Sequence, residues 1–283
     1  MIPSFKAELL KLGKRPTTWV LLAVSLALTE LFAYALPYVS YLTGDQSRTT
    51  EGLSTGAVLN GLLPGQLVSN AIGGFPVFTG ALALTFGALT VGGEYGWGTL
   101  KTILTQGPSR MGVFAGKLAA VGAALAVGVL VFFGVGALSS AGIGLAESQP
   151  LHWPGAAALA EGLGSAWLIL AMWAAFGALF AFAFRSVALP IGLGVIWILA
   201  IENLVSSVAN SLLTSLQGLR DLLPGANAGS LVWTLAKATG DTGSLAPGVN
   251  DAVSGPRAVL TLTAYLVVFV LAAALALRRR DVT

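Results

Sequence analysis

Charged side chains are rare in this chain, and several lie together in one short segment. Only 10% of the 283 residues are charged, and the segment Gly92–Lys117 holds four of them: Glu94, Lys101, Arg110 and Lys117. Long apolar runs flank it, at Val68–Val91 and Leu118–Leu138. A polar segment between two apolar runs is a connection in which charged groups can contact water or another protein.

Apolar residues within this segment recur at helical spacing. One face of the predicted helix carries Trp97, Leu100, Ile103 and Leu104. The other faces carry Lys101, Thr102 and Thr105. Gly107-Pro108 predicts the end of this helix, and Ser109-Arg110 predicts the start of the next one. The pattern favours a short amphipathic helix that docks onto a protein in the cytoplasm.

The sequence lacks the residue sets that common catalytic sites require. The string Gly112–Leu118 is one residue short of a nucleotide-binding phosphate loop and lacks the hydroxyl that would hold Mg²⁺. His152 is the single histidine and the chain has no cysteine, which argues against a zinc site. An intramembrane serine hydrolase would need its histidine inside an apolar run, and His152 lies outside them. We therefore predict a non-catalytic chain that binds no ATP, metal or other cofactor itself.

Two carboxylates lie inside apolar runs, where an ionised group is costly. Glu30 lies in the first run, and Glu202 lies in the fifth, followed directly by Asn203. In membrane proteins such residues usually face a polar cavity or a partner. Glu30, Glu202 and Asn203 are therefore candidates for a substrate or proton pathway. The alternative is a structural role, with the acids hydrogen-bonded near the outer membrane surface.

Helices that cross a membrane must position these groups. The chain is 55% hydrophobic, with a mean hydropathy of +0.83, and a helix needs about 20 apolar residues to cross a bilayer. Six stretches are long enough: Thr17–Pro37, Val68–Val91, Leu118–Leu138, Ala158–Phe184, Val187–Val208 and Ala258–Leu277. We predict an all-α polytopic membrane protein with six transmembrane helices and one transmembrane domain over residues 1–283.

Basic residues give the spans a direction. If the N-terminus is cytoplasmic, the inner segments carry Lys6, Lys11, Lys14, Arg15, Lys101, Arg110, Lys117, Arg185, Arg278, Arg279 and Arg280. The outer segments then carry only Arg48, Arg220, Lys237 and Arg257. The positive-inside rule predicts that both termini lie in the cytoplasm. The net charge of +3 fits attraction to anionic membrane lipids, and no basic stripe with interleaved aromatic residues indicates nucleic acid.

Shorter elements are predicted at the two membrane surfaces. Residues 1–15 are predicted to form an interfacial amphipathic helix, with an apolar face of Ile2, Phe5, Leu9 and Leu12. Its opposite face carries Ser4, Glu8 and Lys11. Segment 209–255 is predicted to hold two short outer helices, followed by an exposed loop at Gly240–Ser254.

The second span carries glycines at an interval of seven residues. Gly73, Gly80 and Gly87 fall roughly on one helix face, which permits close contact with another helix. That helix lies within this subunit in one interpretation, and in the other it belongs to a second subunit or a sliding gate. Pro76 predicts a kink near the outer end of the span.

Two stretches resemble the ABC-2-type permeases, the membrane subunits of one class of ABC exporter. The first is F-K-A-E-L-L-K-L-x-K-R-P-T-T-W, and the second is G-G-E-Y-G-W-G-T-L-K-T-I-L-T-x-x-P-S-R followed by G-K. The layout is also similar, with six spans, inner termini, a polar segment between spans two and three, and helical outer elements before span six.

The resemblance implies that segment 93–110 contains a coupling helix, which sits in a groove of a separate ATPase. The coupling residues that it implies are Glu94, Tyr95, Trp97, Thr99, Leu100, Lys101, Thr102, Leu104 and Arg110. ATP and Mg²⁺ would bind to the partner ATPase. Two identical permease chains on two ATPases, surrounded by membrane lipids, are the assembly that the resemblance implies.

These observations favour the permease subunit of an ATP-driven exporter in a bacterial plasma membrane. Its substrate would be an amphipathic small molecule, a peptide or a lipid-like molecule, moved by alternating access. One alternative is an ion-coupled secondary transporter that uses Glu30 and Glu202, although inverted halves and intramembrane charge pairs are not evident. A membrane-embedded enzyme is the third, and the missing catalytic residues argue against it.

Overall fold

The computed structural model describes all residues except 1, 45–51, 97–108, 212–213, 241–245 and 280–283. The described residues contain helices and no strands. Six of their helical stretches are long and apolar enough to cross a membrane: Pro16–Thr43, Pro64–Tyr95, Arg110–Ala146, Ala156–Phe184, Ala188–Ala209 and Gly255–Arg278. The prediction of an all-α chain with six membrane-crossing helices is confirmed.

Several of these spans are built from more than one helical piece. The first span joins α2 (Pro16–Glu30), η1 (Leu31–Ala35) and α3 (Leu36–Thr43). The second joins η2 (Pro64–Gln66), α5 (Leu67–Ile72), η3 (Phe75–Thr79) and α6 (Gly80–Gly96). The fifth joins α10 (Ala188–Ile196), η4 (Trp197–Ile201) and α11 (Glu202–Ser211). The remaining three are single helices: α8 (Arg110–Ala146), α9 (Ala156–Phe184) and α14 (Gly255–Arg279).

The second span is interrupted where the sequence predicts a kink. Pro76 lies in the π-helical turn η3, where the Thr79 N–H donates to the Gly74 carbonyl at 3.0 Å. Proline has no N–H to donate and its ring crowds the preceding turn, so the helix widens there. η1 and η4 are also π-helical and lie in the first and fifth spans.

The centre of the bundle is a close crossing of α6 and α9. A Cβ on Gly87 would collide with the Ala174 backbone of α9, and a Cβ on Gly177 would collide with the Leu84 carbonyl of α6. Gly80 lies against the Trp173 indole, where a Cβ would stand 2.6 Å from its ring. Glycine at these positions lets the two backbones approach each other. The interpretation that the span-two glycines pack within the subunit is confirmed for Gly80 and Gly87.

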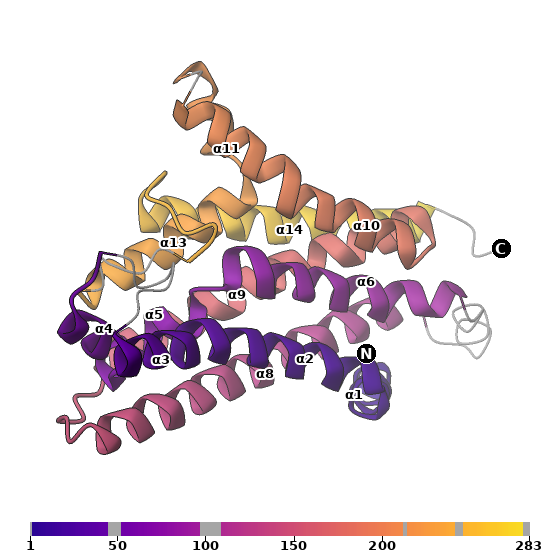
Figure 1. Cartoon of the computed structure of the whole chain (residues 1–283). Coiled ribbons are helices and arrows are strands. Elements are labelled where there is room, and N and C mark those ends of the chain that lie inside the picture. The colour runs from indigo at the N-terminus through magenta and orange to yellow at the C-terminus, as the bar shows by residue number, and fades with distance from the viewer. Residues whose placement is uncertain (1, 45–51, 97–108, 212–213, 241–245, 280–283) are drawn as a thin grey trace.

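The other spans surround this crossing. Figure 1 shows α6 and α9 inside the bundle, with α1 (Ile2–Lys14), α2 and α8 on one side and α10 and α14 on the other. It also shows α1 and the final turns of α6 and α14 at one end of the bundle. We call this end the inner end. The opposite, distal end carries α4 (Thr55–Leu62), α13 (Pro224–Ala238) and the end of α8.

The distal segment is more ordered than the sequence predicts. Two short outer helices are indeed present, α12 (Gln217–Arg220) and α13, together with the turn η5 (Thr214–Leu216). The prediction that Gly240–Ser254 is an exposed loop is right only in part for its described residues: Asp251 and Ser254 are exposed, but other residues pack onto the bundle. Val253 is buried, and the Ser230 hydroxyl of α13 donates to the Asn250 carboxamide at 2.9 Å. The loop is held down because Gly248 packs against Val77 of η3.

The glycine crossing yields a stability prediction. Gly87→Ala should lower the free energy of unfolding by about 1–3 kcal/mol, because the new methyl group overpacks the contact with Ala174. Gly142→Ala on α8 is the matched control, since nothing lies within 4 Å of a Cβ there. Thermal unfolding in detergent measures both variants. Equal melting temperatures for the two would show that α6 and α9 do not cross as closely as described.

Candidate functional site

Four charged side chains meet at the inner end, and three of them are almost completely buried. They are Glu8 and Lys11 of α1, Glu94 near the end of α6, and Lys117 near the start of α8. Glu94 and Lys117 are each 2% exposed. We call these four residues the inner charge cluster. Its two carboxylates and two ammonium groups give the cluster a formal net charge of zero.

Short contacts connect all four groups. Lys117 Nζ lies 2.8 Å from Glu8 Oε2 and 2.9 Å from Glu94 Oε1. Lys11 Nζ lies 2.6 Å from Glu94 Oε1 and also pairs with Glu8. Glu94 Oε1 therefore accepts from both lysines, while its Oε2 is buried and has no hydrogen-bond partner among the residues that the structure describes. The cluster ties α1, α6 and α8 together at one point.

Local sequence explains why α1 reaches this position. Glu8 and Lys11 are three residues apart and so share a helix face. Gly116 of α8 lies against Ser4 and Phe5, which lets α1 approach closely. Burial lowers the pKa of Lys11, and the carboxylates of Glu8 and Glu94 more than offset this, so that its pKa lies above the ordinary value. Lys11 therefore stays charged at neutral pH.

This arrangement corrects the predicted faces of the N-terminal helix. Glu8, predicted on the face opposite the apolar residues, is buried against α8, whereas Ile2 is 68% exposed. Leu12 is buried as the pattern requires. Glu8 turns inward beside Phe5, Leu9 and Leu12, which pack on the core, because Lys117 offers it an opposite charge, and an unpaired buried charge would be far more costly than a paired one.

The predicted coupling residues fall into two groups. Trp97, Thr99, Leu100, Lys101, Thr102 and Leu104 lie outside the described residues. Glu94, Tyr95 and Arg110 are described. Glu94 is buried in the cluster, and the Tyr95 ring packs edge-on against Phe182 with centroids 6.3 Å apart. Arg110 is exposed in the first turn of α8, whose N-cap Ser109 accepts from the Gly112 N–H at 3.1 Å. The predicted start of a helix at Ser109-Arg110 is confirmed.

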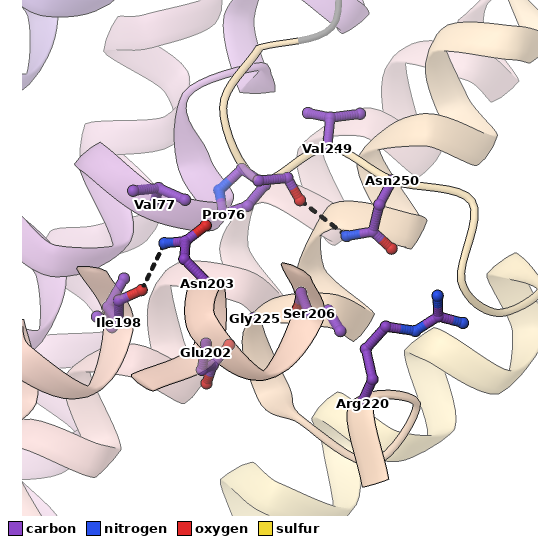
Figure 2. Close-up of a pocket in the computed structure, with 12 residues that line it drawn as sticks. Pro76, Val77, Ile198, Glu202, Asn203, Ser206, Arg220, Gly225, Val249 and Asn250 are labelled. Carbon is purple, nitrogen blue, oxygen red and sulfur yellow. Dashed lines mark hydrogen bonds between the residues drawn. The ribbon is translucent and has the colours of Figure 1, made fainter. Parts of the chain in front are cut away.

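A small cavity of about 120 Å³ lies near the distal end, and Figure 2 shows its lining. Five parts of the chain meet there: η3, the η4–α11 junction, α12 with Arg220, the start of α13, and the loop before α14. Glu202 lines this cavity, is 5% exposed and accepts from the Trp197 indole N–H at 2.7 Å. Asn203 also lines it and donates to the Ile198 and Leu199 carbonyls, each at 3.1 Å.

The structure separates the two predicted intramembrane acids. Glu30 lies at the end of α2, half-buried, and accepts from the Ser139 hydroxyl of α8 at 2.5 Å. It does not line the cavity that contains Glu202 and Asn203. The described residues therefore do not form a single pathway through Glu30, Glu202 and Asn203. Among the described residues, no group of three His, Cys, Asp or Glu side chains could hold a metal ion.

Sequence reasoning missed the pairing of Glu8, Lys11 and Lys117 with Glu94. It treated the basic residues as markers of orientation, and each charge was assigned to its own segment. The available signal was the scarcity of charge: a chain with so few ionisable groups places them near the ends of apolar helices, where opposite charges can pair. The bonds from Tyr38 and Tyr41 to Glu147, each 2.9 Å, were missed for the same reason.

The charge balance of the cluster yields a second prediction. Glu94→Gln and Lys117→Met should each lower the free energy of unfolding by about 3–5 kcal/mol, because each leaves the buried cluster with one charge in excess. The double variant restores the balance, so its cost should be smaller than the sum of the two single costs. Lys6→Met is the matched control, because Lys6 is exposed on α1. Denaturation of all four variants in detergent gives the interaction energy, and strict additivity would contradict the cluster.

Comparison with known proteins assigns the chain to a family. Residues 3–282 match the family described as ABC-2 family transporter protein. A comparison with curated proteins gives no match. Because the family match covers nearly every residue and the described part has six helices able to cross a membrane, the chain belongs to the ABC-2 family of transporter proteins and is a transmembrane subunit of an ABC transporter.

Proposed function

We propose that this chain is the permease of an ATP-driven exporter in a bacterial plasma membrane, with a separate ATPase docked at the inner end. The observation that carries the proposal is the family match over residues 3–282. The family association supports an ABC ATPase as partner. ATP and Mg²⁺ would bind to that partner, since the chain has no phosphate-loop sequence of its own. Both termini then lie in the cytoplasm, as the distribution of basic residues predicts.

The inner charge cluster supports a route by which the ATPase would move the bundle. Glu94 precedes the predicted coupling helix, and Lys117 follows it. Both side chains are held by α1 through Glu8 and Lys11. Force on the coupling segment would therefore reach the end of α6 and the start of α8 together, with α1 attached to both. Glu94 would act by positioning these helices, because a side chain that is 2% exposed cannot contact the ATPase surface.

Rigid transmission through the core would follow from the α6–α9 crossing. Because glycine backbones meet there, a displacement of α6 would carry α9 with it. The bundle would rock between inward-open and outward-open states, which is alternating access.

The same interpretation includes a second identical permease. Large apolar side chains are exposed on α10 and α14, among them Leu189, Ile196, Leu260 and Leu271, and they would face lipid or that second chain.

An amphipathic or lipid-like molecule is the substrate class that this surface favours. The exposed faces of the spans are rich in large apolar side chains, and the two predicted intramembrane acids, Glu30 and Glu202, are both hydrogen-bonded. The ion-coupled alternative would route a proton through Glu30 and Glu202. The family assignment favours ATP as the energy source, and the separation of the two acids offers no shared ion path.

Loss of the docking face tests the proposed function. Leu100→Asp should abolish co-purification with the partner ATPase, because an unpaired carboxylate in an apolar contact costs about 2–5 kcal/mol, or about 1.5 to 3.5 powers of ten in affinity. Thr105→Asp, on another face of the predicted helix, is the matched control and should still co-purify. Both variants should insert into the membrane normally. An intact complex with Leu100→Asp would refute the docking assignment.

A further inference from the structure

The outer helix α13 begins without a capping side chain of its own. Its N-cap residue is Leu223, whose side chain has no oxygen to accept a hydrogen bond, and Pro224 occupies the first turn. The first N–H groups of a helix have no partner within the helix and need an acceptor. Asn227 does not supply one: its carboxamide N–H group donates to the Asp221 and Leu223 carbonyls at 2.9 and 2.8 Å, and its Oδ1 accepts no hydrogen bond from the described residues.

A carboxylate from another helix, that of Glu202, lies at this N-terminus. It packs directly against the Gly225 backbone, in the first turn of α13. The Trp197 indole holds the other carboxylate oxygen at 2.7 Å. A negative charge is favourable at a helix N-terminus, where the backbone dipoles present their positive end. Gly225 is needed here because a Cβ would collide with Glu202 Oε2.

Glu202 also stands at the point where the fifth span leaves the bundle. It is the first residue of α11, directly after the π-helical turn η4. Figure 1 shows α11 diverging from the other helices beyond this point. Figure 2 shows Glu202 and Gly225 together on the rim of the distal cavity, with Ser206 one turn further along α11. The contact with α13 therefore holds the diverging helix near the bundle.

We propose that Glu202 caps α13 in trans and thereby holds span five against the outer helix, which limits the width of the distal cavity. Breaking the Glu202–Gly225 contact frees α11 to move away from α13 and widens the cavity. The π-helical turn beside Glu202 gives span five a place to bend. The inference goes beyond the proposed function, because it assigns a conformational role to Glu202 whichever protein docks at the inner end.

Thiol reactivity at Ser206 tests this. The chain has no cysteine, so Ser206→Cys introduces a single thiol that lines the cavity. The full chain is reconstituted in lipid nanodiscs and its reaction rate is measured with one cationic and one anionic methanethiosulfonate. Adding Gly225→Ala should raise the rate with both reagents by about tenfold or more, because the new methyl group displaces the carboxylate from the helix terminus.

Two further variants make the result decisive. Gly218→Ala is the matched control, because nothing lies within 4 Å of a Cβ at Gly218, and it should leave both rates unchanged. Glu202→Ala removes the cap without adding bulk and should raise both rates like Gly225→Ala. Unchanged rates with Glu202→Ala or Gly225→Ala would overturn the proposal. Opposite changes with the two reagents would also overturn it, because they would report altered charge at the thiol and no widening of the cavity.

Discussion

Burial of two carboxylates and two ammonium groups at the inner end constrains the rest of the bundle. A charge removed from water is tolerated only when an opposite charge and hydrogen bonds replace the lost hydration. Glu94 and Lys117 can pair only if the last turns of α6 and the first turns of α8 lie side by side. Both also need α1 beside them, because α1 carries Glu8 and Lys11. The position of the N-terminal helix therefore follows from electrostatics as much as from its apolar residues. Removing any one of the four charges leaves the cluster unbalanced.

The glycine crossing extends this constraint into the membrane. α6 leaves the inner charge cluster and meets α9 through Gly87 and Gly177, where a Cβ on either glycine would collide with the facing backbone. These two helices are the most buried of the spans, and the first, fifth and sixth spans lie around them. Movement that begins at the inner end would thus reach the centre of the bundle through one stiff helix. The peripheral spans, with π-helical turns in the first and fifth, have more freedom.

The sequence predicts the six spans and the helix start at Ser109 correctly, because hydropathy and capping are local properties. Pro76 likewise marks the interruption of span two. What local patterns miss is pairing between distant segments: Glu8 with Lys117, and Glu202 with the start of α13. The spacing of apolar residues in the N-terminal helix indicates an apolar and a polar face, but it does not show which helix each face packs against. Gly248 illustrates the same point, since a glycine in a polar loop gives no sign that it packs on Val77.

The central claim is that the inner charge cluster makes α1, α6 and α8 move as one body. A pulsed electron paramagnetic resonance distance between spin labels at Lys6→Cys and Ala119→Cys tests this for α1 relative to α8, because both positions are exposed and lie on these two helices. In the complex with the ATPase, the account predicts one narrow distance distribution that is the same without nucleotide and with ATP. A distribution that shifts between the two states would show that α1 moves independently and would contradict the account.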